Sequence, residues 1–162
     1  MKIIFLDVDG VLNCRNSTSK CQCFIGIDAD KVKRLRRIVE VTGAKIVLTS
    51  TWKLHWIRDL RYKDEQNELS NYLDRKLRRE NLFISDKTTE DNLKHRGQGI
   101  YDYLSRHQVE SWVVLDDEIF DDYEYYGVMS HLVKTSFYAD NGGLQDEHVE
   151  LAIGLLNTIQ ND

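Results

Sequence analysis

Short apolar segments alternate with amphipathic ones along the whole chain. Five apolar runs end in polar or turn-forming residues, a pattern that predicts buried strands over 2–6, 44–48, 82–85, 111–115 and 131–134. Between them, apolar side chains recur every three or four residues, which predicts helices over 28–42, twice within 52–81, over 97–107 and over 149–159. Because strands that alternate with helices require parallel crossovers, we expect an α/β fold with a doubly wound, mainly parallel sheet.

Glycine and aspartate mark the ends of these segments, since the chain contains no proline. We expect Asp28 or Asp30 to cap the first helix and Gly43 to end it. A length of 162 residues with 41% hydrophobic residues is enough for one hydrophobic core. The sequence therefore predicts a single domain over 1–162.

Charge and hydropathy narrow the range of partners. The net charge of −5 argues against a protein that coats nucleic acid by bulk electrostatics, although it leaves room for a local basic groove. The apolar run Ile3–Leu6 is too short for a signal peptide, and no stretch reaches the roughly 18 apolar residues of a membrane helix. We expect a cytoplasmic monomer that does not associate with membranes.

Three cysteines, Cys14, Cys21 and Cys23, lie in one early segment. An odd number of cysteines in a chain of this kind argues against a disulfide framework. Cys21 and Cys23 are separated by one residue, whereas zinc ligands are usually separated by two to four. We therefore expect free thiols.

Polar residues suited to phosphate chemistry follow three of the predicted strands and precede one helix. In order they are Asp7, Asp9 and Gly10; Thr49 and Ser50; Lys94 and Arg96; and Asp116 and Asp117. In a doubly wound sheet, ligands bind beyond the carboxyl ends of the strands. These residues are therefore expected to meet at one edge of the sheet.

An anionic nucleophile that attacks an anionic phosphate needs a cation to reduce the repulsion. Asp7 at the end of the first strand, with Asp116 or Asp117, offers the carboxylate ligands that Mg²⁺ prefers. Hydroxyl groups from Thr49 and Ser50 can bind the remaining phosphate oxygens. A cation from Lys94 or Arg96 can stabilise the charge of the transition state.

Asp9 lies two residues after Asp7, on the same side of the chain and one step further out. From there it can protonate the leaving oxygen and later activate the water that hydrolyses an aspartyl-phosphate. Gly10 permits a sharp backbone turn close to the substrate.

Each of these features has a structural explanation when it stands alone. Asp-x-Asp and Thr-Ser pairs are common in turns, paired aspartates often cap helices, and single basic residues are usually surface charges. Their conjunction, in this order and at successive strand ends, is what favours a catalytic site.

At this point the sequence resembles the haloacid-dehalogenase-like (HAD) phosphohydrolase superfamily. The resemblance rests on three segments in order: Phe5-Leu6-Asp7-Val8-Asp9-Gly10-Val11-Leu12-Asn13, Ile46-Val47-Leu48-Thr49-Ser50 and Val114-Leu115-Asp116-Asp117. More narrowly, the chain resembles the small HAD domains of "Swiss army knife" RNA-repair proteins. The features shared with that group are Thr49-Ser50-Thr51-Trp52-Lys53, Arg96-Gly97, the acidic pair and Gly143-Leu144.

The resemblance implies a three-layer α/β/α Rossmannoid fold, an aspartyl-phosphate intermediate and Mg²⁺ as cofactor. It also implies Asp7 as nucleophile and Asp9 as general acid and base, which favours phosphate esters because the dehalogenases and phosphonatases lack the second aspartate. The metal ligands we expect are drawn from Asp7, Asp9, Asp116 and Asp117.

Some positions depart from the pattern or leave a choice open. Lys53 stands where the narrower group usually has arginine. The phosphate-binding cation is Lys94 or Arg96, and the register of the following helix favours Arg96. Spacing alone does not choose between Thr49 and Ser50.

The segments between the signatures bear on the substrate. Only about 14 residues, Cys14–Ile27, separate the first signature from the first helix, too few for a helical cap domain. An open site suits a polynucleotide end or a phosphorylated small molecule. Trp52 and Trp56 lie one helical turn apart beside the site, where a structural role is favoured over stacking on a base. Basic clusters over 31–37 and 75–79 are explained most simply as solvated helix faces.

We therefore expect a phosphatase that acts on nucleotide-type esters, with a small-metabolite phosphatase as the nearest rival. A receiver-like signalling module is a weaker reading, because receivers carry the acidic pair after the first strand and the acceptor aspartate after the third. A non-catalytic phosphate-binding module is the remaining alternative.

Overall fold

The structure is a computed structural model, and it describes all residues except 59–67, 90, 92 and 159–162. Its strands are β1 (Lys2–Leu6), β2 (Lys20–Cys21), β3 (Phe24–Ile25), β4 (Lys45–Leu48), β5 (Ile84–Lys87), β6 (Ser111–Asp116) and β7 (Leu132–Lys134). Its helices are α1 (Ala29–Thr42), η1 (Thr51–Leu54), α2 (Glu68–Arg78), α3 (Arg96–Arg106), η5 (Val128–His131) and α4 (Asp146–Asn157), with η marking 3₁₀ turns.

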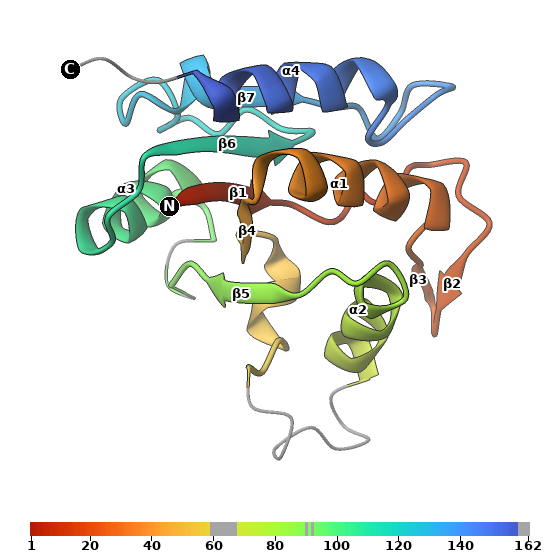
Figure 1. The fold of residues 1–162 in the computed structure, drawn as a ribbon. Helices are drawn as coiled ribbons and strands as arrows, with labels where there is room; N and C mark the ends of the chain where they lie inside the picture. The colour runs from red at the N-terminus through yellow and green to blue at the C-terminus, as the bar shows by residue number, and fades with distance from the viewer. Residues whose placement is uncertain (59–67, 90, 92, 159–162) are drawn as a thin grey trace.

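Five strands form one parallel sheet in the order β5-β4-β1-β6-β7. The chain first builds outward from β1 through β4 to β5, then crosses back to place β6 on the other side of β1 (Figure 1). The order therefore reverses around β1, and such a switch point is where open α/β sheets bind ligands. The predicted doubly wound sheet is confirmed.

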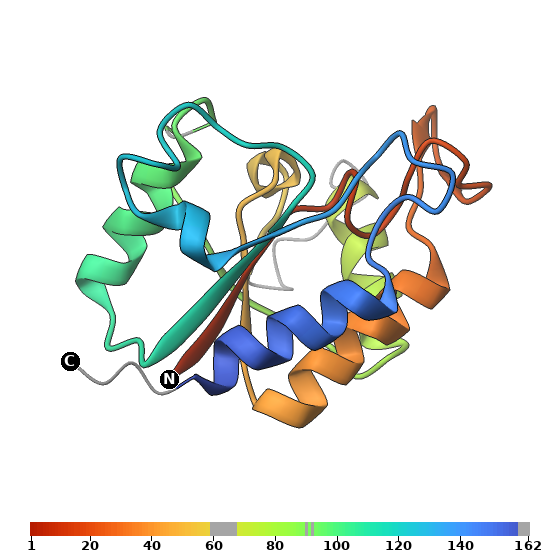
Figure 2. The same cartoon turned by 90° about the horizontal axis from the view of Figure 1, so that it is seen from above.

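Helices cover both faces of the sheet, as a three-layer fold requires. Figure 2 shows α1 and α4 on one side and α3 on the other. Alternate residues of β1 serve the two layers: Ile4 and Leu6 join the core under α1, α2 and α4, while Ile3 and Phe5 join the core under α3. All four are fully buried, which explains why this strand reads as a continuous apolar run.

Several expected elements differ in detail. From residue 52 a helix was expected, but the chain forms only the short η1 turn before the undescribed segment 59–67, where part of that prediction falls. The strand expected over 82–85 begins two residues later, at Ile84. Asp28 is the N-cap of α1, although its carboxylate accepts hydrogen bonds from Ser17 and Lys31 instead of capping the helix. Ile159 lies outside the described residues.

The segment before α1 holds a small hairpin, β2–β3, that the sequence did not predict. All three cysteines in this region are free thiols, as expected: Cys14 and Cys21 are buried and Cys23 is exposed. Among the described helices, none combines the length and apolar character needed to cross a bilayer.

Candidate active site

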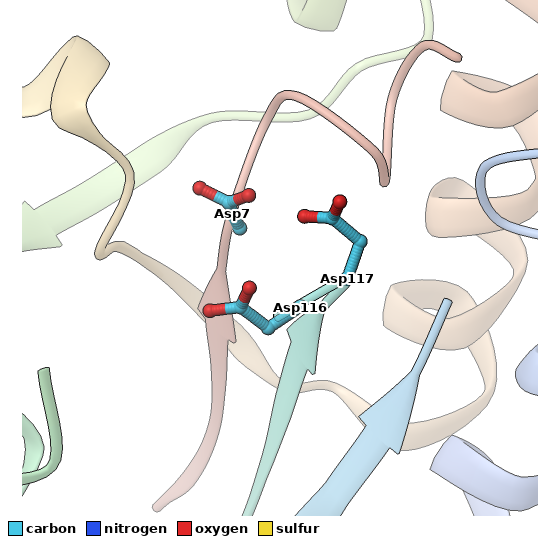
Figure 3. Close-up of side chains that lie close together, drawn as sticks. All are labelled: Asp7, Asp116 and Asp117. Atoms are coloured by element: carbon cyan, nitrogen blue, oxygen red, sulfur yellow. The ribbon is translucent and has the colours of Figure 1, made fainter. Parts of the chain in front are cut away.

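Three carboxylates from two strand ends converge at the switch point. Asp7 follows β1, and Asp116 and Asp117 lie at the end of β6, the strand that pairs with β1. One oxygen of each lies within 4.8 Å of the others, and Figure 3 shows the three side chains turned toward one another. The backbone N–H of Asp7 donates to the carbonyl of Leu115 at 3.0 Å, which aligns the end of β1 with the end of β6. The convergence expected from the strand ends is thus present.

Gly10 allows Asp117 to approach the loop after β1. Its φ is +81°, and a Cβ at this position would lie 2.2 Å from the Cγ of Asp117. The Gly10 carbonyl accepts a hydrogen bond from the Thr135 hydroxyl at 2.6 Å, and its N–H donates to the Asn13 side chain at 2.9 Å. The backbone turn and the position of the Asp117 carboxylate are therefore set by one glycine.

Arg96 supplies the cation of the cluster. Its Nη1 lies 3.0 Å from Asp7 Oδ1 and 2.7 Å from Asp116 Oδ2, and only 8% of the side chain is exposed. The guanidinium also lies over the ring of Phe120, 4.4 Å from the centroid. Lys94, by contrast, is exposed. Of the two cations considered from the sequence, Arg96 is the one that contacts the carboxylates.

The first turn of α3 is held by a carboxylate from another segment. Asp122 accepts hydrogen bonds from the N–H groups of Gly97 at 3.0 Å and Gln98 at 2.9 Å. A Cβ on Gly97 would lie 2.9 Å from the Asp122 carboxylate carbon, so the glycine makes this close approach possible. This contact fixes the helix end from which Arg96 projects, and it gives the Arg96-Gly97 pair a structural reason.

Burial and neighbouring charges shift the pKa values of the ionisable groups in the cluster. Burial raises the pKa of Asp7 to about 8; Arg96 and Ser50 oppose the shift, whereas Asp116 and Asp117 add to it. Burial, followed by the charges of Asp116 and Glu118, raises the pKa of Asp117 to about 6. Burial lowers the pKa of Arg96, but the carboxylates of Asp7 and Asp116 outweigh it and the net shift is upward. The guanidinium therefore stays charged.

These groups fit a divalent cation. When all are ionised, three carboxylates against one guanidinium leave a net charge of −2. Asp116 is fully buried and already engaged: its Oδ1 accepts from the N–H of Glu118 and its Oδ2 from Arg96 and the Tyr123 hydroxyl. Asp117 is only partly buried. Asp7 and Asp117 are therefore the side chains best placed to bind Mg²⁺, and Asp116 orients Arg96.

Asp9 lies apart from this cluster. One carboxylate oxygen accepts from the Asn13 amide at 2.8 Å and the other from the indole N–H of Trp52 at 3.0 Å. The residue is exposed, and it is not among the three carboxylates whose oxygens meet. Of the four expected metal ligands, Asp9 is the one whose side chain lies outside the carboxylate cluster.

The hydroxyl groups after β4 differ in their surroundings. The Ser50 hydroxyl accepts a hydrogen bond from the backbone N–H of Trp52 at 3.4 Å and opposes the rise in the pKa of Asp7, and the backbone N–H of Thr49 donates to the carbonyl of Leu6 at 2.9 Å. The Thr49 hydroxyl is buried and finds no hydrogen-bond partner among the described residues. Thr51, which follows them, is exposed and lines the pocket above the cluster.

That pocket has a volume of about 340 Å³ and opens to solvent over the carboxylates. Its lining includes Asp7, Asp9, Thr51, Arg96, Asp117 and Tyr138. Asp7, Asp9, Asp117 and Arg96 therefore face one space large enough for a phosphate and part of its ester group.

Several contacting residues were not predicted. Tyr123 donates to Asp116 at 2.8 Å, and burial, then the Asp116 charge, raises the pKa of its phenol so that it stays protonated. Asp122 belongs to the same loop, which has no periodic pattern to place it. Asn13 and Trp52 were part of recognised segments, but nothing in their spacing showed that both would donate to Asp9.

Gly143 and Leu144 connect the C-terminal segment to this region. The N–H of Leu144 donates to the carbonyl of Val11 at 2.8 Å. Gly143 has a φ of +77°, and a Cβ there would lie 2.2 Å from the Lys31 side chain. The pair therefore supports the loop that carries Asp9.

Comparison with protein families matches residues 3–149 to the HAD domain in Swiss Army Knife RNA repair proteins. Comparisons with curated proteins and with solved structures gave no significant match. The match includes β1 from Ile3 onward, all the other strands and every element that contributes to the carboxylate cluster. The chain therefore belongs to the family of HAD domains found in Swiss Army Knife RNA repair proteins.

Proposed function

We propose that this protein is a Mg²⁺-dependent phosphomonoester hydrolase that forms an aspartyl-phosphate on Asp7 and acts on nucleotide-type esters, including polynucleotide ends. HAD membership supports phosphohydrolase chemistry in general. The observation that carries the proposal is the convergence of Asp7, Asp117 and Arg96 in one open pocket at the switch point of the sheet.

Asp7 and Asp117 would hold the metal. When bound, Mg²⁺ would neutralise the remaining charge of the cluster and reduce the repulsion between the phosphate and the Asp7 carboxylate. It would also oppose the burial that raises the pKa of Asp7, and so favour the ionised, nucleophilic form.

In the first step, a carboxylate oxygen of Asp7 attacks phosphorus while the bond from phosphorus to the ester oxygen breaks. Asp9 donates its proton to that oxygen, and the alcohol leaves. In the second step, Asp9 takes a proton from a water that attacks the aspartyl-phosphate, which releases inorganic phosphate and restores Asp7. Arg96, already 3.0 Å from Asp7, stabilises the charge on the transferring group.

The test is turnover of para-nitrophenyl phosphate with and without Mg²⁺, in the wild type and in Asp7→Asn. An enzyme of this kind loses activity in both metal-free and mutant samples. A binding module would show no turnover, and a receiver would retain phosphate without rapid release. A panel of mononucleotides and of oligonucleotides phosphorylated at the 5′ or the 3′ end then ranks the substrates. Preference for a simple sugar phosphate over all of these would favour the small-metabolite alternative.

A further inference from the structure

A second pocket lies directly beside the one that contains Asp7. Its volume is about 490 Å³, and three of its lining residues, Asp9, Thr51 and Phe137, also line the pocket above the carboxylates. The remaining walls come from the β2–β3 hairpin, from η1 and from α2. The two pockets therefore adjoin each other, and Asp9 is one of the residues between them.

The lining of this second pocket, which we call the ring pocket, is mostly apolar. Phe24, Trp52 and Phe137 contribute aromatic rings, and Ile25, Leu54 and Leu69 contribute aliphatic side chains. Among the described residues that line it there is no lysine or arginine; His55 is its basic side chain and Asp9 its acidic one. Such walls favour an uncharged planar group and disfavour a second phosphate or a carboxylate.

Two walls of the ring pocket present large apolar side chains to solvent. Phe24 is 50% exposed at the hairpin, and Leu54 is 43% exposed on η1. A planar ligand group bound against them would remove this apolar surface from water, and stacking on aromatic rings tolerates any flat ring system.

We propose that the ring pocket binds the ring of the leaving group, and that the substrate is a phosphate monoester of a ring-bearing alcohol of the nucleoside or phenol type. This inference rests on the proposed function, because it places the phosphate at Asp7. Asp9 gives its proton to the ester oxygen as the bond to phosphorus breaks, so the alcohol attached to that oxygen begins at Asp9. From Asp9, the ring pocket is the adjoining space.

The test compares Phe24→Ala with Phe83→Ala. Phe83 is a matched control: it is 56% exposed, and its ring contacts Arg78 and does not line the ring pocket. The substrates are phenyl phosphate and glycerol 2-phosphate. For each substrate, kcat/KM of a variant is divided by kcat/KM of the wild type, so that the different reactivities of the two leaving groups cancel. Phe24→Ala is expected to lower kcat/KM for phenyl phosphate about tenfold, an effect typical of one lost stacking contact, and for glycerol 2-phosphate less than twofold. Phe83→Ala is expected to change neither.

Leu54→Ala, on another wall, provides a second variant with the same expected selectivity. Equal losses on both substrates, or no loss on phenyl phosphate, would overturn the ring pocket assignment while leaving the phosphatase intact. If the wild type hydrolyses no ester, the proposed function fails. The ring pocket assignment is then tested separately by calorimetry, which compares the binding of phenyl phosphate to Asp7→Asn and to the Asp7→Asn/Phe24→Ala double variant. Weaker binding of phenyl phosphate to the double variant than to Asp7→Asn, with unchanged binding of inorganic phosphate, supports the ring pocket assignment. Equal binding of phenyl phosphate to the two variants overturns it.

Discussion

Arg96 is the residue on which the charge balance of the site depends. It lies between Asp7 and Asp116, and both of these carboxylates are almost completely removed from solvent. Removing one partner from a buried ion pair leaves an uncompensated charge, which is typically destabilising by about 3–5 kcal/mol. The same guanidinium faces the pocket in which we expect the phosphate.

We therefore expect Arg96→Ala to lower both the stability of the fold and the affinity for inorganic phosphate. Lys94 is exposed, so Lys94→Ala should change the free energy of unfolding by less than about 0.5 kcal/mol, as is usual for surface substitutions. Chemical denaturation and phosphate binding by calorimetry measure the two effects. A larger loss of phosphate affinity in Lys94→Ala would reverse the assignment.

Residue-level prediction from the sequence worked where strand ends determine position. Asp7, Asp116 and Asp117 were expected together because parallel strands share their carboxyl edge, and the structure brings them together. The helical register favoured Arg96 over Lys94. Tyr123 and Asp122 were not foreseen, because they come from an irregular loop whose path depends on tertiary packing.

At the scale of elements, the backbone conformation of the turn after β1 determines how closely Asp117 approaches it. Gly10 and Gly43 both have positive φ, +81° and +69°, but only Gly10 has neighbouring atoms where a Cβ would stand. Alanine substitutions at these two positions therefore separate the effect of backbone strain from the effect of a steric collision with Asp117.

Both alanine substitutions should destabilise the fold by about 1 kcal/mol through the left-handed backbone alone. Gly10→Ala should also displace Asp117 and reduce Mg²⁺-dependent turnover, whereas Gly43→Ala should retain wild-type kcat. Denaturation curves and steady-state kinetics on the two variants check this. Equal kcat in both would show that the position of Asp117 does not depend on Gly10.

The start of α4 contains a pH-sensitive contact. The Nδ1 atom of His148 accepts a hydrogen bond from the Gln145 N–H at 3.0 Å, which requires an unprotonated nitrogen. Burial lowers the pKa of this half-buried ring, although the Glu147 carboxylate opposes the shift. Because the folded pKa is lowered, the contribution to stability is complete above the ordinary value of 6.5 and is lost as the pH falls through the lowered value.

We expect His148→Gln, which keeps an acceptor at this position, to reduce the loss of stability in acid by about 1 kcal/mol, the usual scale of a helix cap. The free energy of unfolding of both proteins is measured from neutral pH down to about pH 5, a range that spans the titration of an ordinary histidine. His107→Gln, on an exposed ring, is the control. Parallel pH profiles for wild type and His148→Gln would contradict the assignment.

The elements that the sequence predicted well are those with strong patterns. β1 and β6 are buried on both faces and appear as continuous apolar runs, and α1 ends at Gly43 as its left-handed conformation requires. The β2–β3 hairpin was missed because each strand has two residues, too few for an alternation to appear. The ring pocket was missed with it, since the hairpin forms one of its walls.

At the scale of the whole molecule, the topology concentrates negative charge at one edge of the sheet. Burial raises the pKa of Asp7 to about 8 and of Asp117 to about 6, so without metal their contribution to stability is greatest in acid and is lost as the pH rises through these values. A divalent cation binds the ionised carboxylates and competes with protons.

Mg²⁺ should therefore raise the Tm more in mild alkali than in acid. At about 100 times its dissociation constant, we expect a rise of roughly 5–10 °C near pH 8 and a much smaller one near pH 5. Differential scanning fluorimetry with Mg²⁺ or with a chelator measures the shift, and Asp117→Asn is the control that should lose it. An equal rise at both pH values, or an unchanged rise in Asp117→Asn, would place the metal elsewhere.

The most direct measurement identifies the residue that receives the phosphoryl group. The protein is mixed with para-nitrophenyl phosphate and Mg²⁺, quenched in acid within one turnover, reduced with borohydride and analysed by peptide mass spectrometry. An acyl phosphate on Asp7 would be reduced to homoserine at position 7, and this product is expected in the wild type mixed with substrate and absent in samples that lack substrate. Turnover that proceeds with Asp7 unmodified, or with the phosphoryl group on another residue, would contradict the account.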